Sequence, residues 1–230
     1  MTDFIVDIVQ RNEPIIIGVD EAGRGPLFGS VYTGVAILPT EDTEFDRSGL
    51  KDSKKFTSKK KIKQVFDYIQ ENTNYCCYDY ADHEEIDKIN ILQATQKSMH
   101  RGVHKVITKV IETLKHNEIF DTKIFETMKI LVDGNYFNTF KYFYNDRFFI
   151  IQHECLVKGD SLSKEISAAS ILAKVGRDNY IDEFIEENPE YDEMYSLSKN
   201  KGYATKAHIE GIKKYGYSPY HRKSFKLKSI

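Results

Sequence analysis

The apolar positions of this chain fall into two patterns, short continuous runs and longer stretches with apolar residues three and four apart. The short runs, rich in β-branched and aromatic residues, predict strands at 15–20, 31–38, 74–81, 129–133 and 148–157. The helical spacing predicts helices at 58–71, 89–114, 163–185 and 205–215. A glycine-rich turn separates the first two strands, so we expect them to pair as a hairpin.

This order of strands and helices predicts an α/β fold in which helices flank a mixed central sheet. The sequence contains no internal repeat, and no linker rich in glycine and serine divides it. We therefore expect a single domain over residues 1–230, with an α/β core at about 15–195 and a basic, helical C-terminal extension at about 196–230. The last part of that extension, 218–230, shows neither pattern and is expected to be irregular.

The composition is that of a folded globular protein that does not enter a membrane. Of 230 residues, 40% are hydrophobic and 30% are charged. No run approaches the roughly 18 apolar residues that cross a bilayer, and acids interrupt the apolar patch near the N-terminus, which disfavours a secretory signal. The three cysteines form no C-x-x-C pair, which argues against structural zinc and favours a reducing, cytoplasmic compartment.

A net charge of −2 conceals an uneven distribution of basic residues. Residues 199–230 contain nine lysines and arginines but a single acid, and residues 51–63 contain seven lysines and one aspartate. Two basic regions on a nearly neutral chain favour local contact with a polyanion such as a nucleic acid. The alternative is that both regions are simply solvated surface.

Acidic residues stand at or just beyond the ends of three predicted strands. Asp20 and Glu21 end the first strand, Asp133 ends the fourth, and Asp160 follows the fifth. Acids beside a core are costly unless they are paired or bind a cation, and strand ends can converge at one edge of an α/β sheet. Converging carboxylates suit hard divalent cations such as Mg²⁺, which favours two-metal phosphoryl chemistry. Taken singly, each acid could instead be a loop or cap residue facing solvent.

Two further features suggest contacts with a nucleotide. The segment 23–26, Gly-Arg-Gly-Pro, departs from the dinucleotide-binding pattern G-x-G-x-x-G because Gly29 comes one residue late. Its glycines would let the backbone approach a sugar hydroxyl such as the ribose 2′-OH, although an ordinary turn is the simpler interpretation. Tyr203 lies among basic residues and could stack on a sugar or base, or could pack against its neighbours.

Seven motifs, in order and spread over residues 15–225, are together similar to those of the ribonuclease HII family. They read GVDEAGRGPLFGSV, LKDSKKFTSKKK, INILQATQKSM, LVDGN, VKGDSLSKEISAASILAKVGRD, NKGYATKAH and KKYGYSPYHRKSF. The resemblance implies a ribonuclease H-like fold with a helical C-terminal region. It implies hydrolysis of RNA in RNA/DNA hybrids with Mg²⁺ or Mn²⁺. It also implies incision on the 5′ side of a ribonucleotide embedded in duplex DNA, leaving 3′-hydroxyl and 5′-phosphate ends.

The same resemblance implies roles for particular residues. The catalytic and metal-binding acids would be Asp20, Glu21, Asp133 and Asp160. By the general two-metal scheme, Asp20 and Asp133 with help from Glu21 would hold one ion, and Asp20 with Asp160 would hold the second.

The substrate would meet both the glycine segment and the basic regions. Gly23, Arg24, Gly25 and Tyr203 would together contact the 2′-OH at the RNA–DNA step. Phosphate contacts are expected from basic residues near these motifs, namely Lys54, Lys55, Lys174, Lys201, Lys206 and Arg222.

The chain departs from the usual family pattern at Phe28 and Ser30, where alanine and proline are common, and at Gly176, where threonine is usual. None of these is one of the four acids, so the departures concern loop geometry. The related ribonuclease HIII carries an extra N-terminal domain and a different glycine segment, which favours ribonuclease HII here. Two alternatives stay open: another metal-dependent nuclease or phosphatase, and a nucleic-acid-binding module without activity. We expect the protein to act as a monomer.

Overall fold

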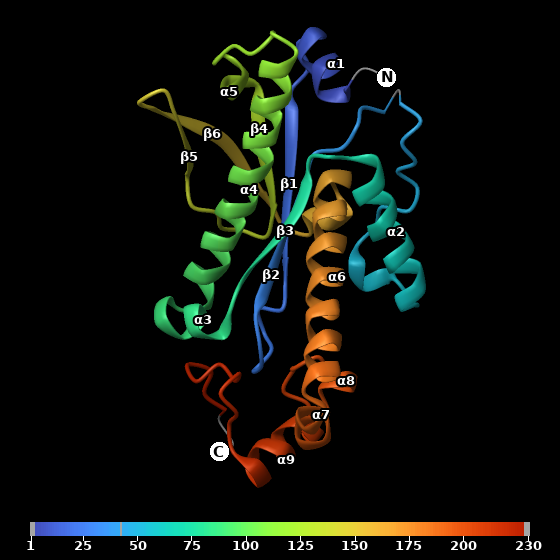
Figure 1. Ribbon diagram of the computed structural model, residues 1–230, viewed down its shortest axis with the longest axis vertical. Coiled ribbons are helices and arrows are strands. Elements are labelled where there is room, and N and C mark those ends of the chain that lie inside the picture. The colour runs from blue at the N-terminus through green and yellow to red at the C-terminus, as the bar shows by residue number, and fades with distance from the viewer. Residues whose placement is uncertain (1–2, 42, 228–230) are drawn as a thin grey trace.

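The computed structural model describes residues 3–41 and 43–227 and places a six-stranded sheet at the centre of that part of the chain (Figure 1). Its strands are β1 (Ile15–Ala22), β2 (Val31–Ala36), β3 (Cys76–Ala81), β4 (Met128–Asp133), β5 (Phe140–Tyr144) and β6 (Arg147–Leu156). Their order across the sheet is β3-β2-β1-β4-β6-β5. β1, β4 and β6 run parallel, and the other pairings are antiparallel. The predicted mixed sheet and the hairpin between β1 and β2 are confirmed.

Helices cover both faces of this sheet. They are α1 (Phe4–Gln10), α2 (Lys59–Asn72), α3 (His83–Ile89), α4 (Ile91–His116), α5 (Ile124–Thr127), α6 (Lys164–Glu187), α7 (Pro189–Tyr195), α8 (Leu197–Asn200) and α9 (Lys206–Tyr215). Two 3₁₀ turns, η1 (Ser53–Lys55) and η2 (Gly159–Ser161), lie between them. None of the helices in the described ranges combines the length and apolarity that a membrane span requires.

The long helices α4 and α6 lie on opposite faces of β2. A Cβ on Gly34 would meet the backbone of Ala169 in α6, whereas the next strand residue, Val35, contacts the place where a Cβ on Gly102 of α4 would stand. Successive strand residues point to opposite faces, so these two contacts identify the two layers. Figure 1 shows the central strands passing between the two helices.

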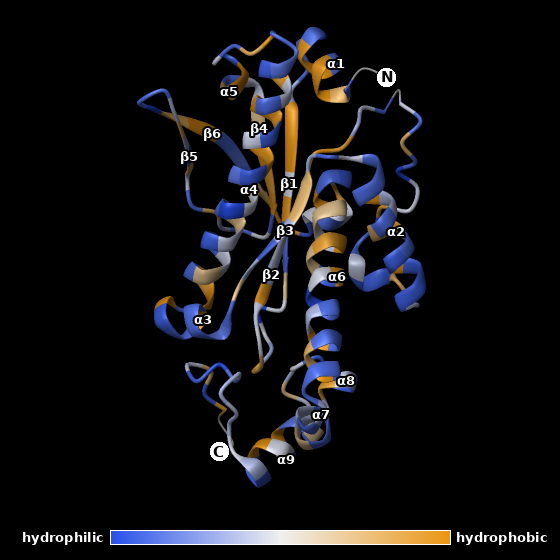
Figure 2. Cartoon of the chain, in the orientation of Figure 1, coloured by the Kyte–Doolittle hydropathy of each residue, from blue (hydrophilic) through white to orange (hydrophobic). Residues whose placement is uncertain are grey.

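The hydrophobic core of the described residues has four parts, the smallest of which lies between the ends of β2 and β3 and the helices α3 and α4. The largest, between the sheet and α4, includes Ile17, Val19, Val35, Val103 and Ile107. A second part joins α2 and α6 to the other face, and a third packs the loop after β1 against the C-terminal helices. Figure 2 shows hydrophobic colours along β1 and β4 and a mostly hydrophilic α2. The third part fixes the C-terminal extension to the segment that follows the acids of β1.

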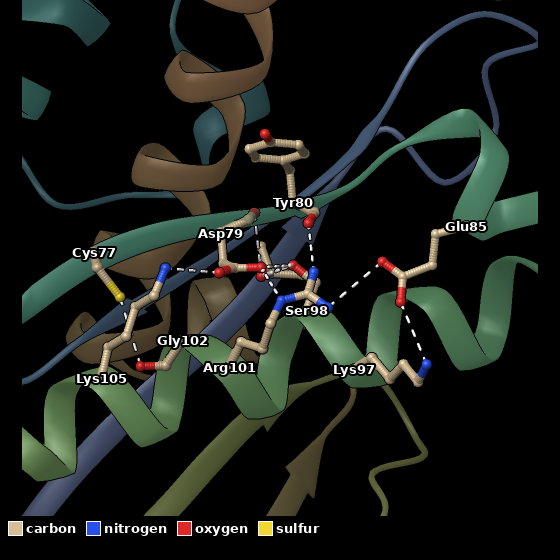
Figure 3. Close-up of polar contacts among 10 residues, drawn as sticks. Cys77, Asp79, Tyr80, Glu85, Lys97, Ser98, Arg101, Gly102 and Lys105 are labelled. Atoms are coloured by element: carbon tan, nitrogen blue, oxygen red, sulfur yellow. Dashed lines mark hydrogen bonds and ion pairs between the residues drawn. The ribbon is translucent and has the colours of Figure 1, made fainter.

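A buried polar cluster ties β2 and β3 to α4 (Figure 3). The carboxylate of Asp79 accepts hydrogen bonds from Arg101 Nε and Lys105 Nζ, both at 2.8 Å, and from Ser98 Oγ at 3.1 Å. The Ser98 hydroxyl in turn lies 2.7 Å from Thr33 Oγ1 on β2. Two cations and a hydroxyl thus satisfy the buried Asp79 carboxylate, and the cluster links this edge of the sheet to α4.

All nine predicted strands and helices are present, with bounds that differ by a few residues. The sequence reasoning missed β5 and the short helices α1, α3, α5, α7 and α8. For β5 a signal was available, because Asn145 and Asp146 form a two-residue turn with positive φ of 46° and 57°, the geometry these residue types tolerate in hairpins. Within 218–227 the chain has a single bridge and is otherwise irregular, as predicted, whereas 228–230 lie outside the described residues.

Candidate active site

The carboxyl ends of three strands meet at one edge of the sheet and bring distant acids together. β1 and β4 are parallel neighbours whose register pairs Val19 with Val132, so the residues that follow, Asp20 and Asp133, lie side by side. On the other side of β4, the strand β6 ends beside Asp133 and leads into the η2 turn, which carries Asp160. The topology thus places all three segments at the same edge.

Hydrogen bonds hold the η2 turn against the end of β4. The Gly159 amide donates to Oδ1 of Asp133 at 2.7 Å. The Ser167 hydroxyl, on the first turn of α6, donates to the Asp160 carbonyl at 2.6 Å. Asp160 is therefore tied both to the strand that carries Asp133 and to α6.

Burial and repulsion by neighbouring acids raise the pKa values of the two acids on β1, Asp20 and Glu21. Asp20 is 5% exposed, and its burial, together with the charges of Glu21 and Asp133, raises its pKa well above the usual value. Burial also raises the pKa of Glu21, although Arg24 opposes this with its Nη1 atom 3.3 Å from Oε1. Negative charge gathered in this way is relieved when a cation binds.

A fifth acid, Asp52, lies beside Asp160 and was missed by the sequence reasoning. Burial raises the pKa of Asp160, and the charges of Asp52 and Asp133 raise it further. Asp52 also caps η1 by accepting a hydrogen bond from the Lys54 amide at 2.9 Å. It stands in a lysine-rich segment whose composition points to positive charge, although an aspartate before a helical turn is a recognisable cap.

Lys54 and Lys55, on η1, lie near the acids. Partial burial lowers the pKa of Lys54, but the charges of Asp160 and Asp20 outweigh it and raise that pKa above its ordinary value. Lys55 Nζ is 3.3 Å from the Ser161 hydroxyl in the η2 turn. Both ammonium groups are thus placed beside the edge where the carboxylates converge.

The acids fit a divalent cation by their chemistry. Carboxylate oxygens are the donors that Mg²⁺ and Mn²⁺ prefer. In the part of the chain that the structure describes, no three His, Cys, Asp or Glu side chains are already gathered as a metal cage. The pKa of the buried Asp20 nevertheless stays raised, because burial and the charges of Glu21 and Asp133 act on it together. Binding a divalent ion would draw these side chains together and relieve that repulsion.

The glycine segment after β1 lies against Tyr203. Gly23 has a φ of +88°, and a Cβ there would lie 2.0 Å from Nε of Arg177, so only glycine fits. A Cβ on Gly25 would lie 3.6 Å from the Tyr203 ring, which is itself 5.8 Å from the Arg177 guanidinium. Tyr203 is 47% exposed. The structure thus brings the glycine segment and an accessible aromatic ring together, and sequence reasoning missed the arginine between them.

Two of the predicted phosphate contacts involve cations that this structure buries. Arg222 is fully buried, and among the described residues its guanidinium donates only to backbone carbonyls of the loop after β1. Lys201 is largely buried and pairs with Asp182. Charge alone did not reveal that these cations are occupied by partners brought from elsewhere in the chain. Lys206, by contrast, has a side chain that is 90% exposed, and Lys174 is partly exposed beside Asp178.

The arrangement of sheet and helices defines the class. The crystal structure of ribonuclease H2 from Pyrococcus horikoshii OT3 matches with a TM-score of 0.57 at 25% identity, over 92% of this chain and 93% of that one. The crystal structure of Bst-RNase HIII in complex with Mn²⁺ matches with a TM-score of 0.56 at 18% identity, over 93% of this chain and 67% of that one. The chain has the ribonuclease H-like α/β fold, as the resemblance implied.

The sequence comparisons narrow this class to one family. The family model described as Ribonuclease HII matches residues 17–228. The ribonuclease HII of Francisella philomiragia subsp. philomiragia is 42% identical over 92% of this chain and 96% of its own length. The chain belongs to the ribonuclease HII family, and it is accordingly a hydrolase, an endoribonuclease of ribonuclease H type 2. The alternative of a binding module without activity no longer stands.

Proposed function

We propose that this enzyme hydrolyses the RNA strand of RNA/DNA hybrids and incises duplex DNA on the 5′ side of an embedded ribonucleotide, leaving 3′-hydroxyl and 5′-phosphate ends. The observation that carries the proposal is the convergence of Asp20, Glu21, Asp133 and Asp160 at one sheet edge, where burial and neighbouring negative charge raise the pKa values of Asp20, Glu21 and Asp160. The family membership and the glycine segment beside Tyr203 support it.

The acids are proposed to hold divalent metal ions. Asp20 and Asp133, with help from Glu21, would hold one ion, and Asp20 with Asp160 the other. A pair of Mg²⁺ or Mn²⁺ ions, when bound, supplies the Lewis acidity for attack of water on the phosphorus and for departure of the 3′-oxygen. A relative of the same fold, Bst-RNase HIII, has been crystallised in complex with Mn²⁺, which supports this choice of cation. Lys54 and Lys55 would counter the remaining charge of the phosphate.

The ribose would be recognised by the glycine segment. With no side chains at Gly23 and Gly25, the backbone can approach the 2′-OH, the group that distinguishes RNA from DNA. Tyr203 would stack on the sugar of the next nucleotide, where a deoxyribose lets the ring come close. Lys174 and Lys206 would contact flanking phosphates, which position the duplex without reading its sequence.

The direct test is cleavage of a DNA duplex that contains one ribonucleotide. We expect incision on its 5′ side with Mg²⁺ or Mn²⁺ and none in EDTA. Asp133→Asn should lower the rate by about two orders of magnitude or more, because it removes a charged group from the reacting centre. Asp146→Asn, the same change on the exposed β5–β6 turn, is the control and should leave the rate unchanged.

Two outcomes would contradict the proposal. Substantial turnover by Asp133→Asn would remove this residue from the catalytic set. Equal cutting of an all-DNA duplex would favour the other open alternative, a nuclease that does not select for ribose.

A further inference from the structure

Arg222 makes an unusual set of contacts for a fully buried cation. Its Nε donates to the Gly29 carbonyl at 2.7 Å, its Nη1 to the Arg24 carbonyl at 2.9 Å and its Nη2 to the Gly23 carbonyl at 2.7 Å. No carboxylate of the described residues lies within ion-pair distance of it. Among the described residues, its guanidinium therefore donates hydrogen bonds to the loop that follows β1 and to no other segment.

The hydrogen bonds to the carbonyls of Gly23 and Arg24 determine where the backbone amides of the residues that follow them point. In a trans peptide the C=O of one residue and the N–H of the next are directed oppositely. Because Arg222 holds the carbonyls of Gly23 and Arg24, the amides of Arg24 and Gly25 are directed away from Arg222. Among the hydrogen bonds of the described residues, neither of these two amides has an acceptor. Two successive free amides of this kind form a small donor site for an oxygen ligand.

The guanidinium itself is held in place by the backbone around it. The Arg222 amide donates to the Leu27 carbonyl at 2.8 Å, and the Gly29 amide donates to the Tyr220 carbonyl at 3.0 Å. A bridge between Phe28 and His221 joins the same two segments. The planar guanidinium of arginine has several N–H donors and can bond three neighbouring carbonyls at once. The single ammonium of lysine cannot hold all three carbonyls in the same geometry.

We propose that Arg222 is a positioning residue for ribose discrimination: it turns the carbonyls of Gly23 and Arg24 inward so that the amides of Arg24 and Gly25 face the 2′-OH of the substrate. This role rests on the proposed function, in which the glycine segment meets the ribose. It replaces the phosphate contact expected from the sequence, and it explains why a cation without a carboxylate partner is buried at this place.

The test measures the preference for ribose over deoxyribose separately from the stability of the protein. Affinities would be measured in EDTA for a duplex with one ribonucleotide and for the identical all-DNA duplex. Arg222→Lys keeps the charge and should lower the preference for the ribonucleotide by about tenfold, the effect of about one lost charged hydrogen bond, while affinity for the all-DNA duplex changes little. Lys213→Met removes a positive charge from an exposed position on α9 of the same extension and should leave the preference unchanged. Thermal unfolding of each variant shows whether it is folded.

A measurement on the unaltered enzyme covers the case in which Arg222→Lys does not fold. The ¹⁵N–¹H signals of Arg24 and Gly25 should shift on adding the ribonucleotide-containing duplex and shift less with the all-DNA duplex. Unchanged signals, or an Arg222→Lys enzyme that is folded and keeps the full preference, would overturn the role of Arg222 alone. An unaltered enzyme without any preference would instead overturn the proposed recognition of ribose, and this role with it.

Discussion

Gly23 illustrates how strongly a single residue is constrained at the edge of the site. Its φ of +88° is unfavourable for residues with a side chain, and the place of its missing Cβ is filled by the Arg177 guanidinium. Arg177, 2% exposed, donates in turn to the carbonyls of Phe28, Ser30 and Lys201. The loop is therefore shaped by a side chain 154 positions along the chain, at the middle of α6.

We expect Gly23→Ala to reduce both stability and cleavage at a single ribonucleotide. The backbone strain and the contact at 2.0 Å from Arg177 Nε should together cost about 1–3 kcal/mol of unfolding free energy. The matched control is Gly216→Ala, because Gly216 has a φ of +80° but nothing within 4 Å of the added Cβ. Chemical denaturation of both variants separates the backbone strain from the contact with Arg177. Equal losses of unfolding free energy would show that the contact with Arg177 is unimportant.

At the scale of elements, α6 connects most parts of the site. It follows the turn that carries Asp160, and it supplies Lys174 and Arg177 farther along its length. Its close approach to the sheet depends on two strand glycines, since a Cβ on Gly18 would lie 2.1 Å from Glu165 and one on Gly34 would lie 2.0 Å from Ala169. Both of these contacts are with helix backbone, which cannot move aside as a side chain can.

Gly34→Ala should therefore displace α6 and weaken the enzyme as a whole. We expect a loss of about 1–3 kcal/mol in unfolding free energy, the usual cost of overpacking, with a parallel loss of activity because Asp160 shifts relative to Asp133. Gly49→Ala is the comparison, since its Cβ would touch only the Val65 side chain, at 3.2 Å. Stability and rate would be measured for both, and an unaffected Gly34→Ala would mean that the helix tolerates the shift.

At the scale of the molecule, a buried histidine pair joins the segments of the C-terminal extension. The Ser218 amide donates to Nδ1 of His221 at 2.9 Å, so the neutral ring carries its proton on Nε2 and donates it to Nε2 of His208 at 3.0 Å. His208 then donates from Nδ1 to the Tyr203 carbonyl at 2.9 Å. This chain of hydrogen bonds requires both rings to be neutral, and it fixes the backbone of Tyr203.

The histidine pair predicts that stability falls in acid. Burial, then the neighbouring His208, lowers the pKa of His221 to about 3 from its usual 6.5, and burial also lowers the pKa of His208. The unfolded chain therefore binds protons that the fold excludes. The stabilisation is complete above about pH 6.5 and is lost as the pH falls towards 3, at up to about 1.4 kcal/mol per pH unit for each ring.

Thermal unfolding between pH 7.5 and 5 checks this. His221→Gln should be less stable at pH 7.5. Its stability should also depend less on pH, because glutamine binds no proton in the unfolded chain. His116→Gln, a change at the exposed end of α4, should keep the dependence of the unaltered enzyme. An unchanged slope in His221→Gln would show that other groups cause the loss of stability.

Much of the fold and of the candidate site was predictable, for reasons that can be named. Apolar periodicity is local, so β1, β4 and α6 could be located from their own residues. The convergence of Asp20 and Asp133 could likewise be expected from their positions at strand ends, because parallel strands must end at a common edge. Asp52 and Arg177 could not be assigned in this way, since each gains its neighbours from segments far away in the chain.

The longer elements, four of the five acids and the family could be recognised from the sequence alone, because they depend on residue type and on order along the chain. Which charges are exposed could be read only from the folded chain. Lys206 and Arg222 look alike as basic residues, yet one is solvated on α9 and the other is enclosed by the loop after β1. Exposure depends on what covers a side chain, and the covering segments here come from the opposite end of the chain.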